Sequence, residues 1–166
     1  MSELTPDDPA TYDLPISDQL PLFVDQHRDM IARSLNGLTE AEARRELVPS
    51  STTMLGLVKH ATFVERVWFE EAVTGRSRAE SGIAADPERS FVLLEEDSID
   101  SVLADHRSAV ERSREVIASL GLDAVVTGNR RGSLPTRWIL LHMLRELAQH
   151  CGHADILREQ LLAART

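Results

Sequence analysis

The chain of 166 residues is 42% hydrophobic and 27% charged, a composition typical of a globular protein and not of a disordered one. Its length suits about one domain, which can bury roughly two-thirds of its unfolded surface without disulfides. The formal net charge of −9 provides no basic surface for nucleic acid or for an anionic membrane. We therefore expect neither as a partner.

The cysteine content and the length of the apolar runs indicate the cellular compartment of the protein. Cys151 is the only cysteine, so an internal disulfide is excluded and a reducing compartment fits best. The acidic, proline-containing start does not have the pattern of a signal peptide, and no apolar run approaches the ~20 residues of a membrane span. We expect a cytoplasmic protein.

Hydrophobic periodicity predicts four long amphipathic helices, at about residues 17–36, 53–74, 98–120 and 134–165. Residues 1–16 are predicted to form an N-terminal arm. Thr39 and Glu42 have capping-box spacing and predict a short extra helix ending near residue 47. Ser17 and the run 50–52 are expected to cap the first two long helices, and residues 75–90 and 122–133 are expected to be connections. The sequence predicts an all-α protein, with a four-helix bundle spanning residues 17–166.

Three ionisable residues interrupt the apolar stripe of the last predicted helix. At ~100° per residue, Glu146, His150 and His153 fall on the same face as Ile139, within about two turns. Burying such groups is costly unless they are paired, hydrogen-bonded or bound to a metal. His60 lies in the apolar stripe of the second long helix, and bundles build metal sites from inward side chains on facing helices.

Two interpretations of this cluster remain open from the pattern alone. Imidazole and carboxylate ligands suit Zn, Ni, Fe or Mn, and two His with one Glu leave coordination positions free, whereas His153 as a fourth ligand would close the site. Without a metal, Glu146 would pair with His150 or His153, and His60 would be an ordinary core histidine.

Other candidate groups are expected to be structural. His27 and His106 lie on apolar stripes and are predicted to be core residues. His142 lies off the stripe of its helix and is predicted to be exposed or half-buried. Cys151 points ~100° away from His150, so we expect a small buried apolar residue and not a nucleophile.

Two segments resemble the DinB-like superfamily, in particular its actinobacterial branch of mycothiol-dependent, maleylpyruvate isomerase-like enzymes. They are LGLVKHATFVERVWF at 55–69 and WILLHMLRELAQHCGHADILRE at 138–159. The resemblance implies a four-helix bundle with a divalent metal held by His60, Glu146 and His150. A glutamate at 146, where many relatives have histidine, agrees with the isomerase-like branch. His153 stands where many relatives have glutamine.

The resemblance favours a metal-dependent enzyme that uses a low-molecular-weight thiol such as mycothiol for S-transfer to an electrophile or for thiol-assisted isomerisation. His153 would then act beside the metal as a catalytic residue, and Arg145, Asp155 and Arg158 would bind parts of the thiol cofactor. A homodimer is possible. The alternatives are a non-catalytic metal or small-ligand binding module closed by His153, and a hydrolase that uses metal-bound water.

Overall fold

The computed structural model describes residues 4–165 and confirms the predicted all-α bundle. None of the helices in this part of the chain is long and apolar enough to cross a membrane. The elements are η1 Pro9–Thr11, α1 Ile16–Arg33, α2 Glu40–Ala43, α3 Met54–Glu65, η2 Arg66–Glu71, α4 Ala72–Thr74, η3 Arg89–Phe91, α5 Ile99–Ser119, β1 Val125–Val126, β2 Leu134–Pro135 and α6 Thr136–Ala163.

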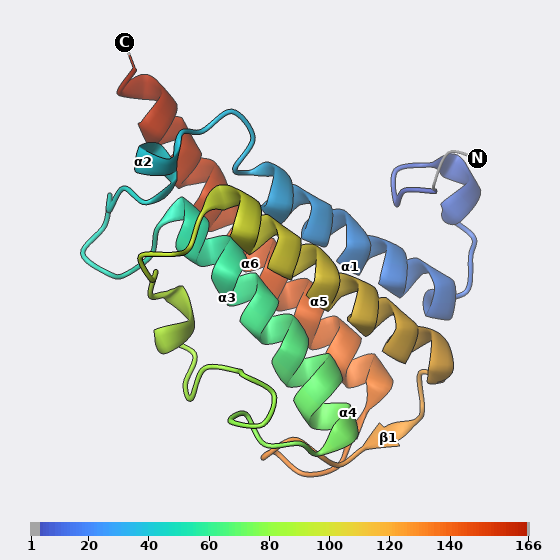
Figure 1. Ribbon diagram of the computed structural model, residues 1–166. Coiled ribbons are helices and arrows are strands. Elements are labelled where there is room, and N and C mark those ends of the chain that lie inside the picture. The colour runs from blue at the N-terminus through green and yellow to red at the C-terminus, as the bar shows by residue number, and fades with distance from the viewer. Residues whose placement is uncertain (1–3, 166) are drawn as a thin grey trace.

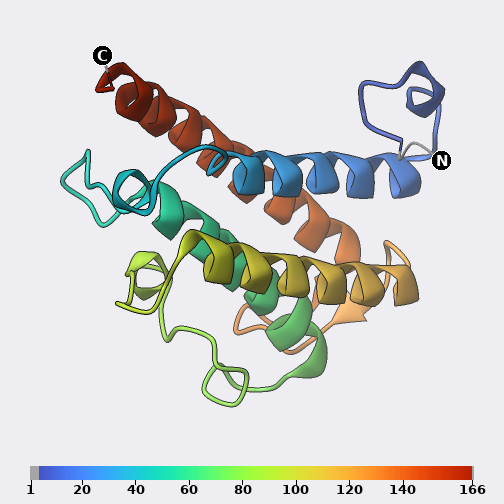
Figure 2. The same cartoon turned by 45° about the horizontal axis from the view of Figure 1, so that its top comes forward.

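The four long helices run in an up-down-down-up order (Figure 1). α1 and α6 run in one direction and pack against each other, while α3 and α5 run in the other direction and form the second packed pair. The views in Figures 1 and 2 both show the connection between α4 and α5 returning along the side of α3. This long return is required because α5 has to start at the end of the bundle where α3 started.

Side-chain caps define the starts of α2, α3 and α5, whereas α1 and α6 begin after a proline without such a cap. The capping box is confirmed: the Thr39 backbone N–H donates to Glu42 Oε2 at 2.8 Å, and Thr39 Oγ1 accepts from the Glu42 backbone N–H. Thr53, and not the run 50–52, caps α3 by accepting the Gly56 N–H at 3.0 Å. α1 begins directly after Pro15, so Ser17 lies inside its first turn and is not the cap.

The second long helix is not a uniform α-helix as predicted. Its middle, η2, has π-helical hydrogen bonding, which places an additional residue in the turn. Val67, Trp68 and Phe69 are all buried there.

The predicted linker at 122–133 also contains structure that the sequence did not reveal. β1 and β2 form a small antiparallel hairpin in which Val125 lies opposite Pro135 and Val126 lies opposite Leu134. Strands of two residues are too short to show the alternation by which strands are recognised. The hairpin is nevertheless important, because its loop, residues 127–133, covers one end of the bundle near α4 (Figure 1).

The buried face of α1 contains a charge that replaces part of the predicted apolar stripe. Phe23 and Met30 follow the apolar period of the first predicted helix but are exposed, whereas Arg28 is buried. Arg28 donates from Nε and Nη2 to the two carboxylate oxygens of the fully buried Glu65 at 2.7 and 2.6 Å. Burial alone would lower the pKa of Arg28, but the charge and hydrogen bonds of Glu65 hold that pKa above its usual value.

We predict that Glu65→Gln destabilises the fold by about 3–5 kcal/mol, because it removes the buried counter-charge of Arg28 and leaves only the half-buried Asp25, at 2.8 Å, as its acidic partner. Asp105→Asn is the control: it breaks the exposed Arg66–Asp105 ion pair and should cost under about 1 kcal/mol. Chemical denaturation measures both. A similar loss in the two variants would contradict the assigned role of the buried pair.

Candidate metal centre and adjoining pocket

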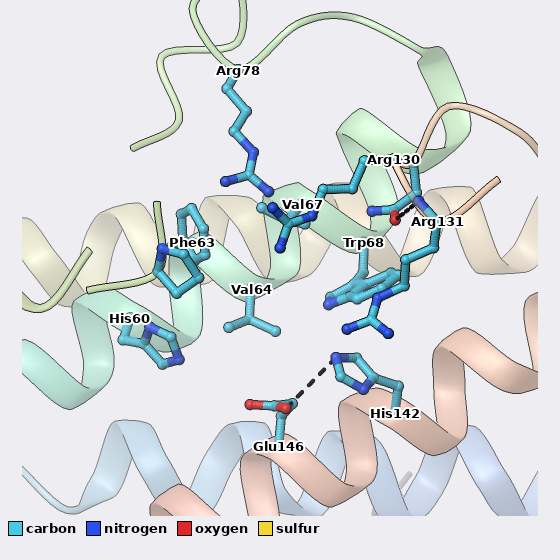
Figure 3. A pocket seen from close by; sticks show the side chains of 12 residues that line it. His60, Phe63, Val64, Val67, Trp68, Arg78, Arg130, Arg131, His142 and Glu146 are labelled. Carbon is cyan, nitrogen blue, oxygen red and sulfur yellow. Dashed lines mark hydrogen bonds and ion pairs between the residues drawn. The ribbon is translucent and has the colours of Figure 1, made fainter. Parts of the chain in front are cut away.

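The contact between α3 and α6 brings together His60, Glu146 and His150. One potential ligand atom from each residue lies within 4.8 Å of the other two. His60 comes from α3, and Glu146 and His150 are one turn apart on α6. Figure 3 shows the side chains of His60 and Glu146 pointing into the same space from opposite helices. The fold therefore brings these three residues together, as predicted.

The loop between α4 and α5 fixes the orientation and the tautomer of His60. Ser90 Oγ donates its hydrogen to the Pro87 carbonyl, and it lies 2.7 Å from His60 Nδ1. Since the Ser90 hydrogen is already engaged, the serine oxygen accepts from His60 Nδ1–H. Phe91 stacks on the imidazole, with ring centroids 4.0 Å apart. The lone pair on His60 Nε2 is then free to bind a metal ion.

The surroundings of His60 keep its imidazole neutral. Burial, and after it the neighbouring His150 imidazole, lowers the pKa of His60 to about 4. Neutral imidazole is the form that coordinates metal ions. His60 therefore needs no deprotonation to act as a ligand near neutral pH.

Glu146 is held as a carboxylate among nitrogen groups. Its Oε2 lies 3.7 Å from His150 Nε2, and its Oε1 lies 3.1 Å from an Arg145 guanidinium nitrogen and 3.7 Å from His142 Nε2. The nearby His150 imidazole contributes most to lowering the pKa of Glu146 to about 2, with Arg145 and His142 adding to the effect. A carboxylate and two imidazoles form a donor set that suits zinc and similar divalent ions.

The separations fit a metal site better than a closed ion pair. At 3.7 Å, Glu146 and His150 are too far apart for a hydrogen bond. His150 Nδ1 is buried and has no hydrogen-bond partner among residues 4–165. An imidazole in this position is costly to bury unless another group binds it. Without a metal, Glu146 and His150 would form only the ion pair at 3.7 Å, and His150 Nδ1 would have no partner among residues 4–165.

A cavity of about 190 Å³ adjoins the three residues. Its floor is apolar, with Phe63, Val64, Val67 and Trp68 from α3 and η2, and its rim is basic. Figure 3 shows Arg78, Arg130 and Arg131 extending over the space above Val64 and Trp68. A small organic molecule entering this cavity would lie between apolar side chains and the His–Glu–His trio.

His142 belongs to this site, and its prediction as exposed or half-buried was wrong. It is 9% exposed, lines the cavity and stacks on Trp138 with ring centroids 5.1 Å apart. An Arg145 nitrogen donates to His142 Nδ1 at 2.9 Å, which leaves Nε2–H facing Glu146. The spacing could have revealed this residue, because His142, Glu146 and His150 follow one another at intervals of four on α6.

The remaining predicted site residues lie outside the cavity lining. The His153 side chain is exposed, and its ring centroid lies 5.6 Å from that of His150. Together with Val48 and Ile156, it borders a neighbouring surface groove. Arg145 contacts the site through His142 and Glu146. The other two are less favourably placed: Asp155 is exposed, and Arg158 donates to the Ser34 and Asn36 carbonyls at 2.7 and 2.8 Å.

A helical bundle with a His–Glu–His trio between two of its helices defines the chain as a DinB-like protein. More specifically, residues 19–163 match the family described as Mycothiol-S-transferase, and the chain belongs to that family. A crystal structure of a mutant of the mycothiol-dependent maleylpyruvate isomerase has a similar fold, with a TM-score of 0.60 at 16% sequence identity. The similarity covers 90% of this chain but 62% of that one. No curated protein sequence matches significantly.

We predict that Ser90→Ala lowers the affinity for Zn²⁺ about 10- to 100-fold, the usual effect of losing a group that orients a ligand, and that His60→Ala abolishes stoichiometric binding. Ser81→Ala is the matched control, because Ser81 lies in the same loop and its buried hydroxyl has no partner among residues 4–165. Competition with a chromophoric chelator measures the affinities. Equal binding by wild type and His60→Ala would refute the site.

Proposed function

We propose that this protein is a metal-dependent S-transferase that joins the sulfur of mycothiol to an electrophilic carbon of a small molecule. The observation that carries the proposal is the convergence of His60, Glu146 and His150 at the wall of a cavity with an apolar floor. Membership of the Mycothiol-S-transferase family indicates that the thiol is mycothiol. Thiol-assisted isomerisation begins with the same attack by sulfur and is a further use of such a site.

The proposed ligands are suited to activating a thiol. A divalent ion held by one carboxylate and two imidazoles lowers the pKa of a bound thiol, so that the sulfur is a thiolate at neutral pH. Two histidines and one glutamate leave coordination positions for such a ligand. Ser90 holds His60 in the binding tautomer, and Arg145 with His142 restricts the Glu146 carboxylate.

The rest of the cavity would hold the acceptor. Phe63, Val64 and Trp68 exclude water around the reacting carbon, which favours attack by sulfur over hydrolysis. In the transfer itself the sulfur forms a bond to the electrophilic carbon while the leaving group departs with the bonding pair, and the thiol proton passes to solvent.

We predict that the zinc-loaded protein accelerates the displacement of chloride from monochlorobimane by mycothiol, and that Glu146→Gln lowers kcat/KM at least about 100-fold because the site loses its only anionic ligand. Fluorescence of the bimane adduct reports the rate. Arg89→Gln, which removes an exposed charge from the loop, is the control. Metal binding without turnover would indicate a binding module, and turnover without thiol would indicate a hydrolase.

We also predict that His153→Gln retains zinc with an affinity within about tenfold of wild type, because the exposed His153 is not one of the three converging ligands. A change in turnover or in its pH profile would support an action of His153 on the thiol or acceptor. A loss of zinc affinity as large as that caused by His60→Ala would instead make His153 a fourth ligand and contradict the enzyme proposal.

A further inference from the structure

The loop of the β1–β2 hairpin places two uncompensated positive charges at the cavity. Arg130 and Arg131 line the same cavity as His60 and Glu146. Figure 3 shows the Arg130 side chain reaching across the space below Arg78, and the Arg131 guanidinium between Trp68 and His142. The Arg131 guanidinium lies 5.9 Å from the Trp68 ring centroid and 5.8 Å from an adjacent Trp138 ring centroid.

These two guanidinium groups lack the acidic partner that a neighbouring arginine has. Arg78 forms an ion pair with Glu71 at 2.9 Å and donates to the Ala85 carbonyl. In the described part of the chain, the guanidiniums of Arg130 and Arg131 make neither an ion pair nor a hydrogen bond. The sequence has 27 acidic residues and 18 basic ones. Carboxylates are therefore abundant, and their number does not explain why two neighbouring arginines are unpaired.

The loop that carries the two arginines is fixed to the bundle. The Gly128 N–H donates to the Ala72 carbonyl at 2.9 Å, and a Cβ at Gly128 would lie 2.4 Å from the Glu71 carbonyl oxygen. Only glycine permits this approach of two backbones. The next residue, Asn129, is buried, and its Oδ1 accepts the Arg131 N–H at 3.0 Å. The arginines therefore start from an anchored backbone.

We propose that Arg130 and Arg131 bind a carboxylate of the electrophile, so that the acceptors of this enzyme are small organic acids. Guanidinium groups match the geometry of a carboxylate and bind it through paired, charge-assisted hydrogen bonds. Both arginines line the cavity whose apolar floor is proposed to hold the acceptor, which assigns the anion to the acceptor and not to the thiol. This inference rests on the proposed S-transfer, in which sulfur bonds to the acceptor carbon and the leaving group departs with its electron pair.

A matched pair of acceptors tests this specificity. Mycothiol displaces iodide from both iodoacetate and iodoacetamide, which differ in charge but react at the same carbon. After subtraction of the uncatalysed rates, the ratio of kcat/KM for iodoacetate to that for iodoacetamide should fall about 10- to 100-fold in Arg130→Gln/Arg131→Gln, the effect of losing a charged hydrogen bond. Arg107→Gln/Arg112→Gln on α5 removes the same charge elsewhere and should leave the ratio unchanged.

Tryptophan fluorescence provides a second test that needs no turnover. Both tryptophans of the chain lie against Arg131. At constant ionic strength, succinate should change their emission in a saturable manner in wild type and in the α5 variant, and not in Arg130→Gln/Arg131→Gln. A saturable response with no S-transfer to either acceptor would contradict the proposed function while retaining the anion site.

Two results would overturn the inference. An equal fall in kcat/KM for both acceptors would place the two arginines on the thiol and not on the acceptor. An unchanged ratio together with the absence of a succinate response in wild type would show that the arginines bind no carboxylate.

Discussion

The contact between α3 and α6 is the constraint on which the site depends. Two helices that pack in the middle of a bundle normally bury hydrocarbon, whereas here they bring together a buried imidazole and a half-buried imidazole and carboxylate. Such groups are stable there only when each has a partner. Ser90 satisfies one nitrogen of His60, and Arg145 and His142 surround Glu146, but His150 keeps a buried nitrogen without a partner in the described chain. A bound cation is the simplest group that would complete this set.

The direction of the chain determines which loops complete the site. Because α3 and α5 are parallel, residues 75–98 return along α3 and bring Ser90 and Phe91 onto His60 (Figure 1). At the other end, the hairpin between α5 and α6 is held against α4 by Gly128. One connection therefore orients a proposed metal ligand, and the other supplies the basic rim of the cavity.

Helical periodicity was sufficient for the bundle and for placing His60, Glu146, His150 and His153 on apolar stripes, and the resemblance to DinB-like proteins then selected His60, Glu146 and His150. A histidine at the centre of one apolar stripe and a Glu-x-x-x-His pair at the centre of another can meet only in the core. Periodicity cannot show which side chain from another element contacts a given polar residue. His142 lies off the stripe of α6 and is buried because Trp68 and Trp138 cover it, and Arg28 replaces an apolar residue because Glu65 faces it. Arg130 and Arg131 lie in a segment with no period at all.

The pairing of α1 with α6 has a consequence for the order in which the bundle is assembled during synthesis. The first long helix buries its apolar side mainly against the last one. Their contacting residues are far apart in the chain: the Cys151 thiol approaches the His27 carbonyl at 3.5 Å across 124 positions. On the ribosome, α1 can contact α3 through the Arg28–Glu65 pair, but its main partner is available only when α6 emerges. A nascent chain that stops before α6 would therefore leave much of the apolar side of α1 in solvent, and of the three proposed metal ligands it would contain His60 but neither Glu146 nor His150.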